Sequence, residues 1–136
     1  MKTISTLALT MALALGAHWS AAADLRPTSQ NGVTYLSGGV GEEERQAMLD
    51  ARGDYKLLLT FSTKGSGEML ADVAVTIRDH AGKEVASLVS PGPMCYLDLA
   101  PGSYRILASA HGKEISRTAV VKPRGRRELY FYWDPV

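Results

Sequence analysis

The chain of 136 residues carries 15 Lys and Arg against 14 Asp and Glu, which gives a formal net charge of +1. This balance argues against a nucleic-acid-binding protein, because such proteins show a strong excess of basic residues. The single cysteine excludes an internal disulfide bond, so the fold must be stabilised by its packed core alone.

Residues 1–23 have the three parts of a secretory signal peptide. Lys2 supplies a short basic start, residues 4–17 form an apolar stretch without charge, and three alanines end at Ala23. The apolar stretch is shorter than the roughly 20 residues that span a bilayer, which favours a cleaved leader over a retained anchor. We therefore expect cleavage after Ala23, a periplasmic or secreted protein, and no membrane span in the mature chain.

Removal of the leader takes away one lysine and no acidic residue, so the formal charge of the mature chain falls to zero. The mature chain begins with residues 24–37, which are polar, contain turn-forming residues and are predicted to form an extended arm. Val33 and Tyr35, together with Leu36, suit either one short strand or a loose tether along the domain. The glycines of residues 38–41 are expected to form a flexible joint.

Residues 42–51 are predicted to form a short helix, which completes an N-terminal unit over residues 24–53. Three glutamates occupy its first turn, where the helix dipole favours negative charge. Gly53 follows its last turn, a position where helices commonly stop. The helix has few apolar residues and can dock only by a narrow stripe.

From residue 54 onward, apolar and polar residues alternate between turn signals, which is typical of β-structure. We expect residues 54–136 to form an all-β, seven-stranded, antiparallel Greek-key sandwich. The expected strands are 55–62, 73–78, 85–89, 94–99, 104–110, 113–121 and 127–133.

A tight turn at the centre of this region is expected to join two strands as a hairpin. Pro101 sets φ for the first central position of a type II turn, and Gly102 suits the positive φ required next. Tyr104 then begins the following strand with its side chain facing the core. Two further hairpin turns are predicted, at residues 79–82 and at residues 111–112.

Two motifs resemble the carboxypeptidase-regulatory-like family. Residues 75–83 read V-T-I-R-D-H-A-G-K, and residues 97–104 read L-D-L-A-P-G-S-Y. Members of this family are transthyretin-like (prealbumin-like) sandwiches of about seven strands. In them, a V-x-V-x-D-x-x-G-K hairpin precedes an L-x-P-G-x-Y turn. The resemblance covers roughly residues 54–133 and implies the fold of a non-catalytic module, here in a small exported bacterial protein.

Two chemistries found in similar folds need residues that this chain lacks. An internal Lys–Asn isopeptide bond needs an asparagine in the last strand; Lys56 suits the lysine, but the only asparagine, Asn31, lies in the arm. Transthyretin-like hydrolases of the purine pathway end in Y-R-G-S, whereas this chain ends in Y-W-D-P-V. We therefore expect no enzyme activity.

The remaining chemically reactive side chains are also expected to be structural. Cys95 alternates in phase with Leu97 and Leu99, which predicts a buried and unreactive thiol. His80 and His111 fall in predicted turns without a second ligand at metal-binding spacing. The sequence therefore predicts no catalytic residue, no metal and no cofactor.

Three arginines and two tyrosines form the candidate binding surface. Arg124, Arg126 and Arg127 are the densest basic group, and Tyr130 and Tyr132 face outward from the last strand. Together they suit a stacking platform for a sugar, an aromatic ligand or an anionic polymer. The simpler interpretation, which the sequence favours, is a solvated loop beside a strand face that the arm or the helix covers.

The expected function is therefore that of an exported, non-catalytic β-sandwich module that binds a protein or an envelope component. The arm and helix would exchange with this partner or add a strand to a sheet edge. The alternative is a module that binds a carbohydrate or a small ligand through Tyr130, Tyr132 and the arginines.

Overall fold

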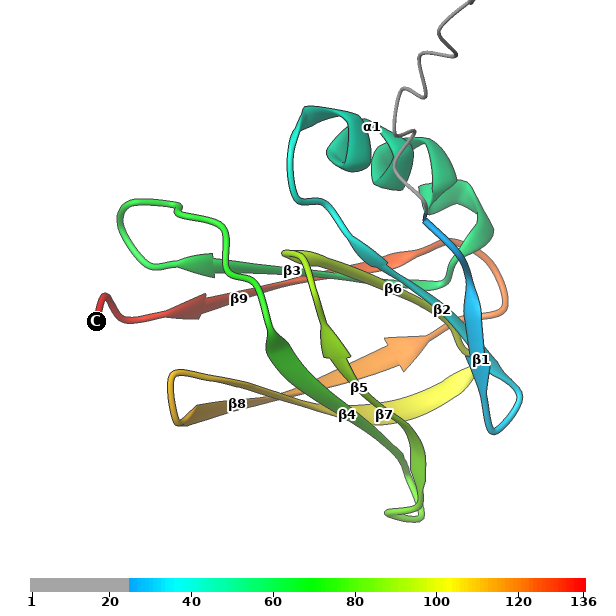
Figure 1. Ribbon diagram of the computed structural model, residues 1–136. Helices are drawn as coiled ribbons and strands as arrows, with labels where there is room; N and C mark the ends of the chain where they lie inside the picture. Colours follow the sequence, from blue (N-terminus) through cyan, green and yellow to red (C-terminus); the bar gives the residue numbers. More distant parts are fainter. Residues whose placement is uncertain (1–24) are drawn as a thin grey trace, which may run out of the picture.

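A computed structural model describes residues 25–136, which form a β-sandwich of two sheets with a helix on one outer face (Figure 1). Residues 1–24, which contain the predicted signal peptide, lie outside the described residues. Within the described part, no helix has both the length and the apolar character needed to cross a membrane. The elements in chain order are β1 (Thr28–Gln30), β2 (Val33–Gly38), α1 (Glu42–Ala51), the short 3-10 helix η1 (Arg52–Asp54), β3 (Leu57–Thr63), β4 (Val73–Asp79), β5 (Glu84–Ser90), β6 (Met94–Asp98), β7 (Gly102–Ala110), β8 (Lys113–Val121) and β9 (Arg127–Trp133).

The described residues form nine strands rather than the predicted seven, and one pair of strands is parallel. The five-stranded sheet has the order β1-β2-β6-β3-β9, and the four-stranded sheet has the order β5-β4-β7-β8. The two additional strands, β1 and β2, come from the predicted arm. β3 and β9 pair in parallel, so the prediction of a fully antiparallel sandwich is wrong.

Alternating side chains from both sheets fill the core between them. The inward positions predicted for β4, β6, β7 and β9 are all buried. Three aromatic rings lie at the centre, with the ring of Phe61 5.7 Å from Phe131 and 6.0 Å from Trp133. Ring pairs at these distances stabilise the core beyond the burial of their area.

A second apolar cluster lies on the opposite face of the five-stranded sheet, beneath α1. The helix has the predicted bounds and docks by a narrow stripe, as predicted, with Met48 fully buried. Leu36, Leu58 and Tyr96 pack in the same cluster. Because α1 covers the outer face of the sheet at the start of β3, Leu58 is buried although it interrupts the apolar–polar alternation of β3. Burial on both faces also makes β2 hard to recognise, since Val33 faces the inter-sheet core and Leu36 faces the helix.

The predicted flexible joint at residues 38–41 is instead a close contact between two chain segments. Gly38 and Gly39 are buried, and the backbone of Gly38 lies directly against Gly92. A Cβ atom on Gly92 would collide with this backbone, so the contact requires glycine. The carboxylate of Glu44 then accepts the backbone N–H of Gly39 at 2.8 Å, which ties the start of α1 to the end of β2.

The turn between β6 and β7 differs from the prediction, because these strands belong to different sheets and form no hairpin. Gly102 opens β7 with φ 159, which is extended backbone rather than the φ of about +80 that a type II turn requires. The chain instead crosses from one sheet to the other at a tyrosine corner. The hydroxyl of Tyr104 donates a hydrogen bond to the carbonyl oxygen of Ala100 at 2.6 Å. Burial raises the pKa of Tyr104, so this hydroxyl remains a donor.

The two predicted hairpin turns are confirmed. Gly82 has φ 81 in the β4–β5 turn, and the carboxylate of Asp79 accepts two backbone N–H groups of that turn. His111 and Gly112 have φ 52 and 74, as a type I′ turn between β7 and β8 requires.

Shortening Met48 tests the attachment of the helix. We expect Met48→Ala to lower the free energy of unfolding by about 2–4 kcal/mol, because it leaves a cavity beneath α1. Met69 is 41% exposed, so Met69→Ala is a matched control that should change stability by less than about 0.5 kcal/mol. Urea unfolding of both variants measures the difference. Equal stability of the two variants would show that α1 is not held by this contact.

Removing one hydroxyl tests the tyrosine corner. We expect Tyr104→Phe to destabilise the fold by about 1 kcal/mol, because the carbonyl of Ala100 loses its donor while the ring remains packed. Tyr35 is half-buried and has no hydrogen bond from its hydroxyl among the described residues, so Tyr35→Phe is the control. Thermal melts that agree for wild type and Tyr104→Phe would contradict a stabilising role for this bond.

Candidate functional site

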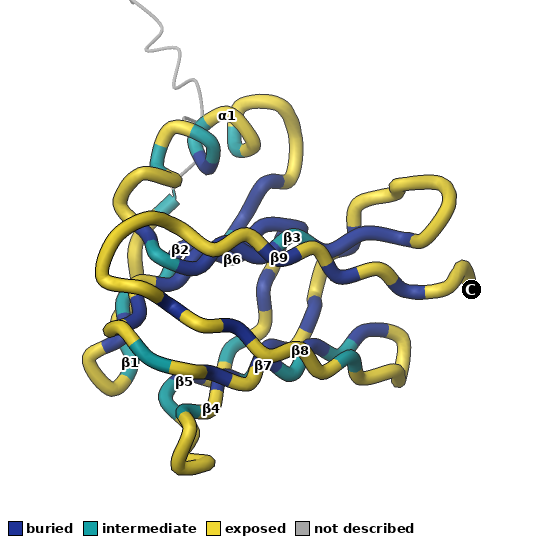
Figure 2. Tube along the Cα trace, turned by 180° about the vertical axis from the view of Figure 1, so that it is seen from behind, coloured by how far each residue is buried: buried dark blue, intermediate teal, exposed yellow. Residues whose placement is uncertain are grey.

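The outer face of β9 presents two exposed tyrosines. The exposed fractions are 48% for Tyr130 and 54% for Tyr132. Neither the arm nor the helix covers them, so the favoured interpretation of a covered strand face is wrong. The ten residues of α1 extend only about 15 Å, and the helix lies over one end of the sheet, leaving the C-terminal halves of β3 and β9 uncovered (Figure 1). The alternating burial along β9 is visible from behind in Figure 2.

A small groove of about 130 Å³ runs between Tyr130 and the helix, and we call it the outer groove. Its polar rim includes Arg52 and Glu128, and Leu58 and Met94 contribute apolar atoms. Its lining residues are Leu49, Arg52, Leu58, Thr60, Met94, Tyr96, Glu128 and Tyr130.

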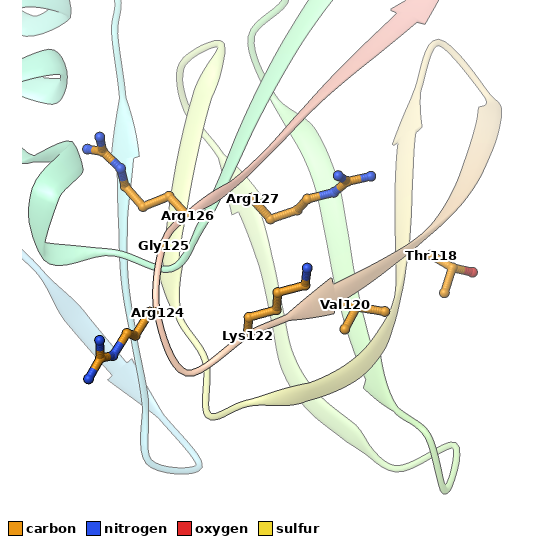
Figure 3. Close-up of a pocket in the computed structure, with 7 residues that line it drawn as sticks. All are labelled: Thr118, Val120, Lys122, Arg124, Gly125, Arg126 and Arg127. Atoms are coloured by element: carbon orange, nitrogen blue, oxygen red, sulfur yellow. The ribbon is translucent and has the colours of Figure 1, made fainter.

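The polar groups at the outer groove interact with one another. The hydroxyl of Tyr130 donates a hydrogen bond to a carboxylate oxygen of Glu128 at 3.3 Å. The negative charge of Glu128 is the main cause that raises the pKa of Tyr130. Burial raises the pKa of Tyr96, and the positive charges of Arg52 and Arg126 act in the opposite direction. The side chain of Arg126 extends away from Lys122 and Arg127, on the other side of the β8–β9 loop (Figure 3).

A second hollow, of about 340 Å³, lies at the loop between β8 and β9, and we call it the loop cavity (Figure 3). Lys122 and Arg127 lie together on the side that faces β8, whereas Arg124 and Arg126 extend away on the other side of the loop. Its lining residues are Thr118, Val120, Lys122, Arg124, Gly125, Arg126 and Arg127.

The five predicted surface residues therefore do not form one platform. Tyr130 and Tyr132 lie on the outer face of the five-stranded sheet. Arg127 alternates with Tyr130 along β9 and lies on the opposite side, beside Lys122. The alternation of a strand separates neighbouring residues onto opposite faces, and this rule was available from the sequence.

Three residues of these hollows were missed by the sequence analysis. Glu128 alternates with Tyr130 and Tyr132, so its place on their face follows from the period of two. Lys122 belongs to the same basic loop as the arginines. Arg52 follows α1 directly, and its position beside β9 depends on how the helix docks, which no local pattern indicates.

The other reactive side chains lie apart from both hollows. Cys95 is fully buried in the inter-sheet core, and burial raises the pKa of its thiol to about 12. His80 and His111 occupy turns at opposite ends of β7, whose nine residues span about 30 Å. Lys56 donates a hydrogen bond to the carbonyl oxygen of Pro123 at 3.4 Å. Across residues 25–136, no three His, Cys, Asp or Glu side chains are grouped to hold a metal ion.

No protein-family model matches the sequence, and a search of curated proteins finds no significant match. The structure supports the coarser part of the resemblance noted above, a β-sandwich of two sheets with one short helix in the described residues.

The burial of Cys95 can be tested with a thiol reagent. At pH 8, a pKa of about 12 leaves about one thiolate in ten thousand, and the closed core excludes the reagent. We expect no alkylation by iodoacetamide in the native protein and complete alkylation in urea, measured by mass spectrometry. Rapid alkylation of the native protein would contradict this burial.

Proposed function

We propose that the chain is an exported, non-catalytic binding module that contacts a protein or another envelope component through the outer face of β9. The observation that carries this proposal is the exposure of Tyr130 and Tyr132 beside the outer groove. Tyrosine supplies a large contact area at a low cost in side-chain entropy, and interfaces are enriched in it. Export rests on the sequence of residues 1–23 alone.

The outer groove adds the chemistry of a contact site to the two rings. Leu58 and Met94 offer apolar atoms in the groove, and Arg52 and Glu128 offer one charge of each sign at its rim. An interface commonly combines such an apolar centre with a polar rim. A projecting side chain of a partner suits this small groove, with the rest of the partner lying across the tyrosines.

The structure gives no support to partner binding by exchange of the N-terminal arm. Five residue pairs join β2 to β6 inside the five-stranded sheet, and Met48 anchors α1 beneath a buried cluster. Release of either element would break a sheet ladder or expose a core. The proposal therefore places the contact on a surface that is already exposed.

The non-catalytic part of the proposal rests on the positions of the nucleophile and the bases. Cys95 is enclosed by apolar side chains, and the two histidines of the described residues, His80 and His111, lie in exposed turns at opposite ends of β7. The outer groove contains one carboxylate and no second acid or base from a His, Asp or Glu side chain. General acid–base chemistry needs such groups within hydrogen-bonding distance of one another or of a shared substrate atom.

Recovery of a partner from an envelope fraction tests the proposal. We expect the mature protein to retain a component by chemical crosslinking, and Tyr130→Ser/Tyr132→Ser to reduce recovery about tenfold through lost contact area. Val89 lies on the other sheet and is 60% exposed, so Val89→Ser is the control and should leave recovery unchanged. No recovery by the wild type, or equal recovery by all three proteins, would contradict the proposal.

A carbohydrate or small ligand is the second candidate for the same surface. Tyr130 and Tyr132 alternate with Glu128 on one strand face, and two rings with a nearby carboxylate suit the faces and hydroxyls of a neutral sugar. Trp133 is a poor fluorescent reporter, because it is buried and its indole N–H is bonded to the carbonyl oxygen of Lys113 at 3.0 Å. Saturable NMR shifts with a neutral oligosaccharide, lost in the double tyrosine variant, would favour this candidate over a protein partner.

A further inference from the structure

Two arginines stand directly opposite each other on the outer face of the four-stranded sheet. Arg78 of β4 is in register with Arg105 of β7, and Arg105 is in register with Thr118 of β8. All three side chains are exposed. Like charges at opposite positions of an antiparallel pair destabilise a sheet, so a bound anion would relieve an unfavourable contact here.

Among residues 25–136, no carboxylate forms an ion pair with the two arginines of this row. Arg105 has no hydrogen-bond or ion-pair partner among residues 25–136, and Arg78 donates one hydrogen bond, to the carbonyl oxygen of Gly82 at 3.3 Å. Glu84 is in register with Arg78 on β5 but forms no ion pair with it. The carboxylate of Asp79 lines the same hollow as the two arginines, and one of its oxygens accepts two backbone N–H groups of its own turn.

The row continues into the loop cavity. A hollow of about 370 Å³ contains Arg78, Arg105 and Thr118, and Thr118 also lines the loop cavity. Lys122 lies four residues further along the outward face of β8, about 13 Å from Thr118, with Arg127 beside it (Figure 3). We call Arg78, Arg105, Lys122 and Arg127, with Thr118 between them, the basic track.

We propose that the basic track binds a linear acidic polysaccharide. The carboxylates of the polysaccharide would contact the four cations, and its hydroxyl groups would contact Thr118 and the neighbouring Ser103. The two linked hollows suit an extended chain rather than a single small anion. Arginine presents paired N–H donors that match a carboxylate. Ser103 and Thr118 supply hydroxyl groups along the same surface, where the rings between successive carboxylates would lie.

The composition of the track favours a polysaccharide over other polyanions. Single-stranded nucleic acids bind proteins by stacking on exposed aromatic rings. Two rings line the hollow that contains Arg78 and Arg105: Tyr104 is buried with its hydroxyl engaged, and His80 is the one exposed ring, so this hollow offers no row of exposed rings for stacking. Val120 is the exposed apolar residue of the loop cavity, which offers little to anchor the apolar side chains of a peptide. Tyr130 and Tyr132 belong to the other sheet, so this site is independent of the function proposed above.

Calorimetric titration with an oligogalacturonate tests the site on the mature protein. We expect binding at about 50 mM salt that weakens at about 200 mM, because salt screens exposed charges. Arg105→Gln/Lys122→Gln should weaken binding about tenfold. Arg45→Gln/Lys64→Gln removes the same two residue types at exposed positions elsewhere and should change affinity less than about twofold.

Four further titrations test the roles of the charge, the ligand class and the proposed function. The methyl-esterified oligomer, which has the same sugar chain without charge, should not bind. A polyglutamate peptide and a single-stranded DNA of similar length should bind more weakly than the oligogalacturonate. Tyr130→Ser/Tyr132→Ser should bind the acidic oligomer as the wild type does. The proposal would be overturned if the oligogalacturonate did not bind, or if the esterified oligomer bound equally well. It would also be overturned if the polyglutamate or the DNA bound more tightly than the oligogalacturonate, or if the two charge variants lost the same affinity.

Discussion

The contact of Met48 with the five-stranded sheet determines which part of the outer face of that sheet is covered and which part is exposed. This side chain is fully buried beneath a helix that is otherwise polar and carries three glutamates in its first turn. Because α1 is short, its docking covers β2, β6 and the start of β3 and leaves β9 open. The helix therefore creates both the buried second cluster and one wall of the outer groove.

At the edges of the sandwich, side-chain hydrogen bonds join a strand of one sheet to a strand of the other, where backbone pairing does not continue. The side-chain oxygen of Gln30 on β1 accepts the backbone N–H of Ser87 on β5 at 2.6 Å, and the side-chain N–H of Gln30 donates to the carbonyl oxygen of Ser87 at 3.0 Å. Arg117 of β8 donates a hydrogen bond to the carbonyl oxygen of Tyr130 on β9 at 3.0 Å. These bonds occupy backbone groups at edges where a foreign strand would pair. Binding by the faces of the sheets is therefore more consistent with this fold than addition of a strand to these edges.

Features that depend on a local pattern could be predicted from the sequence. The helix and both hairpin turns follow from nearby residues, and the inward side chains follow from the period of two. The parallel pairing of β3 with β9 joins segments about seventy residues apart, and no local signal reports it. The L-x-P-G-x-Y motif was interpreted as a hairpin turn, because nothing local shows whether Tyr104 continues in the same sheet or in the other. The outward direction of Tyr130 followed from the period of two, but the favoured interpretation that it is covered was wrong, since its exposure depends on where a distant helix stops covering the sheet.

Net charge describes the whole chain, whereas binding depends on the charge of one face. The near balance of basic and acidic residues argues against a generally basic protein, but it does not describe how the charges are distributed. Glu42 and Glu43 are exposed at the start of α1, over the five-stranded sheet, while Arg78 and Arg105 share the outer face of the other sheet. Exposed charges further apart than about 10 Å are largely screened at physiological salt. A polyanion lying on the four-stranded sheet would therefore respond mainly to the local cations, which makes a nearly neutral chain compatible with an anion-binding face.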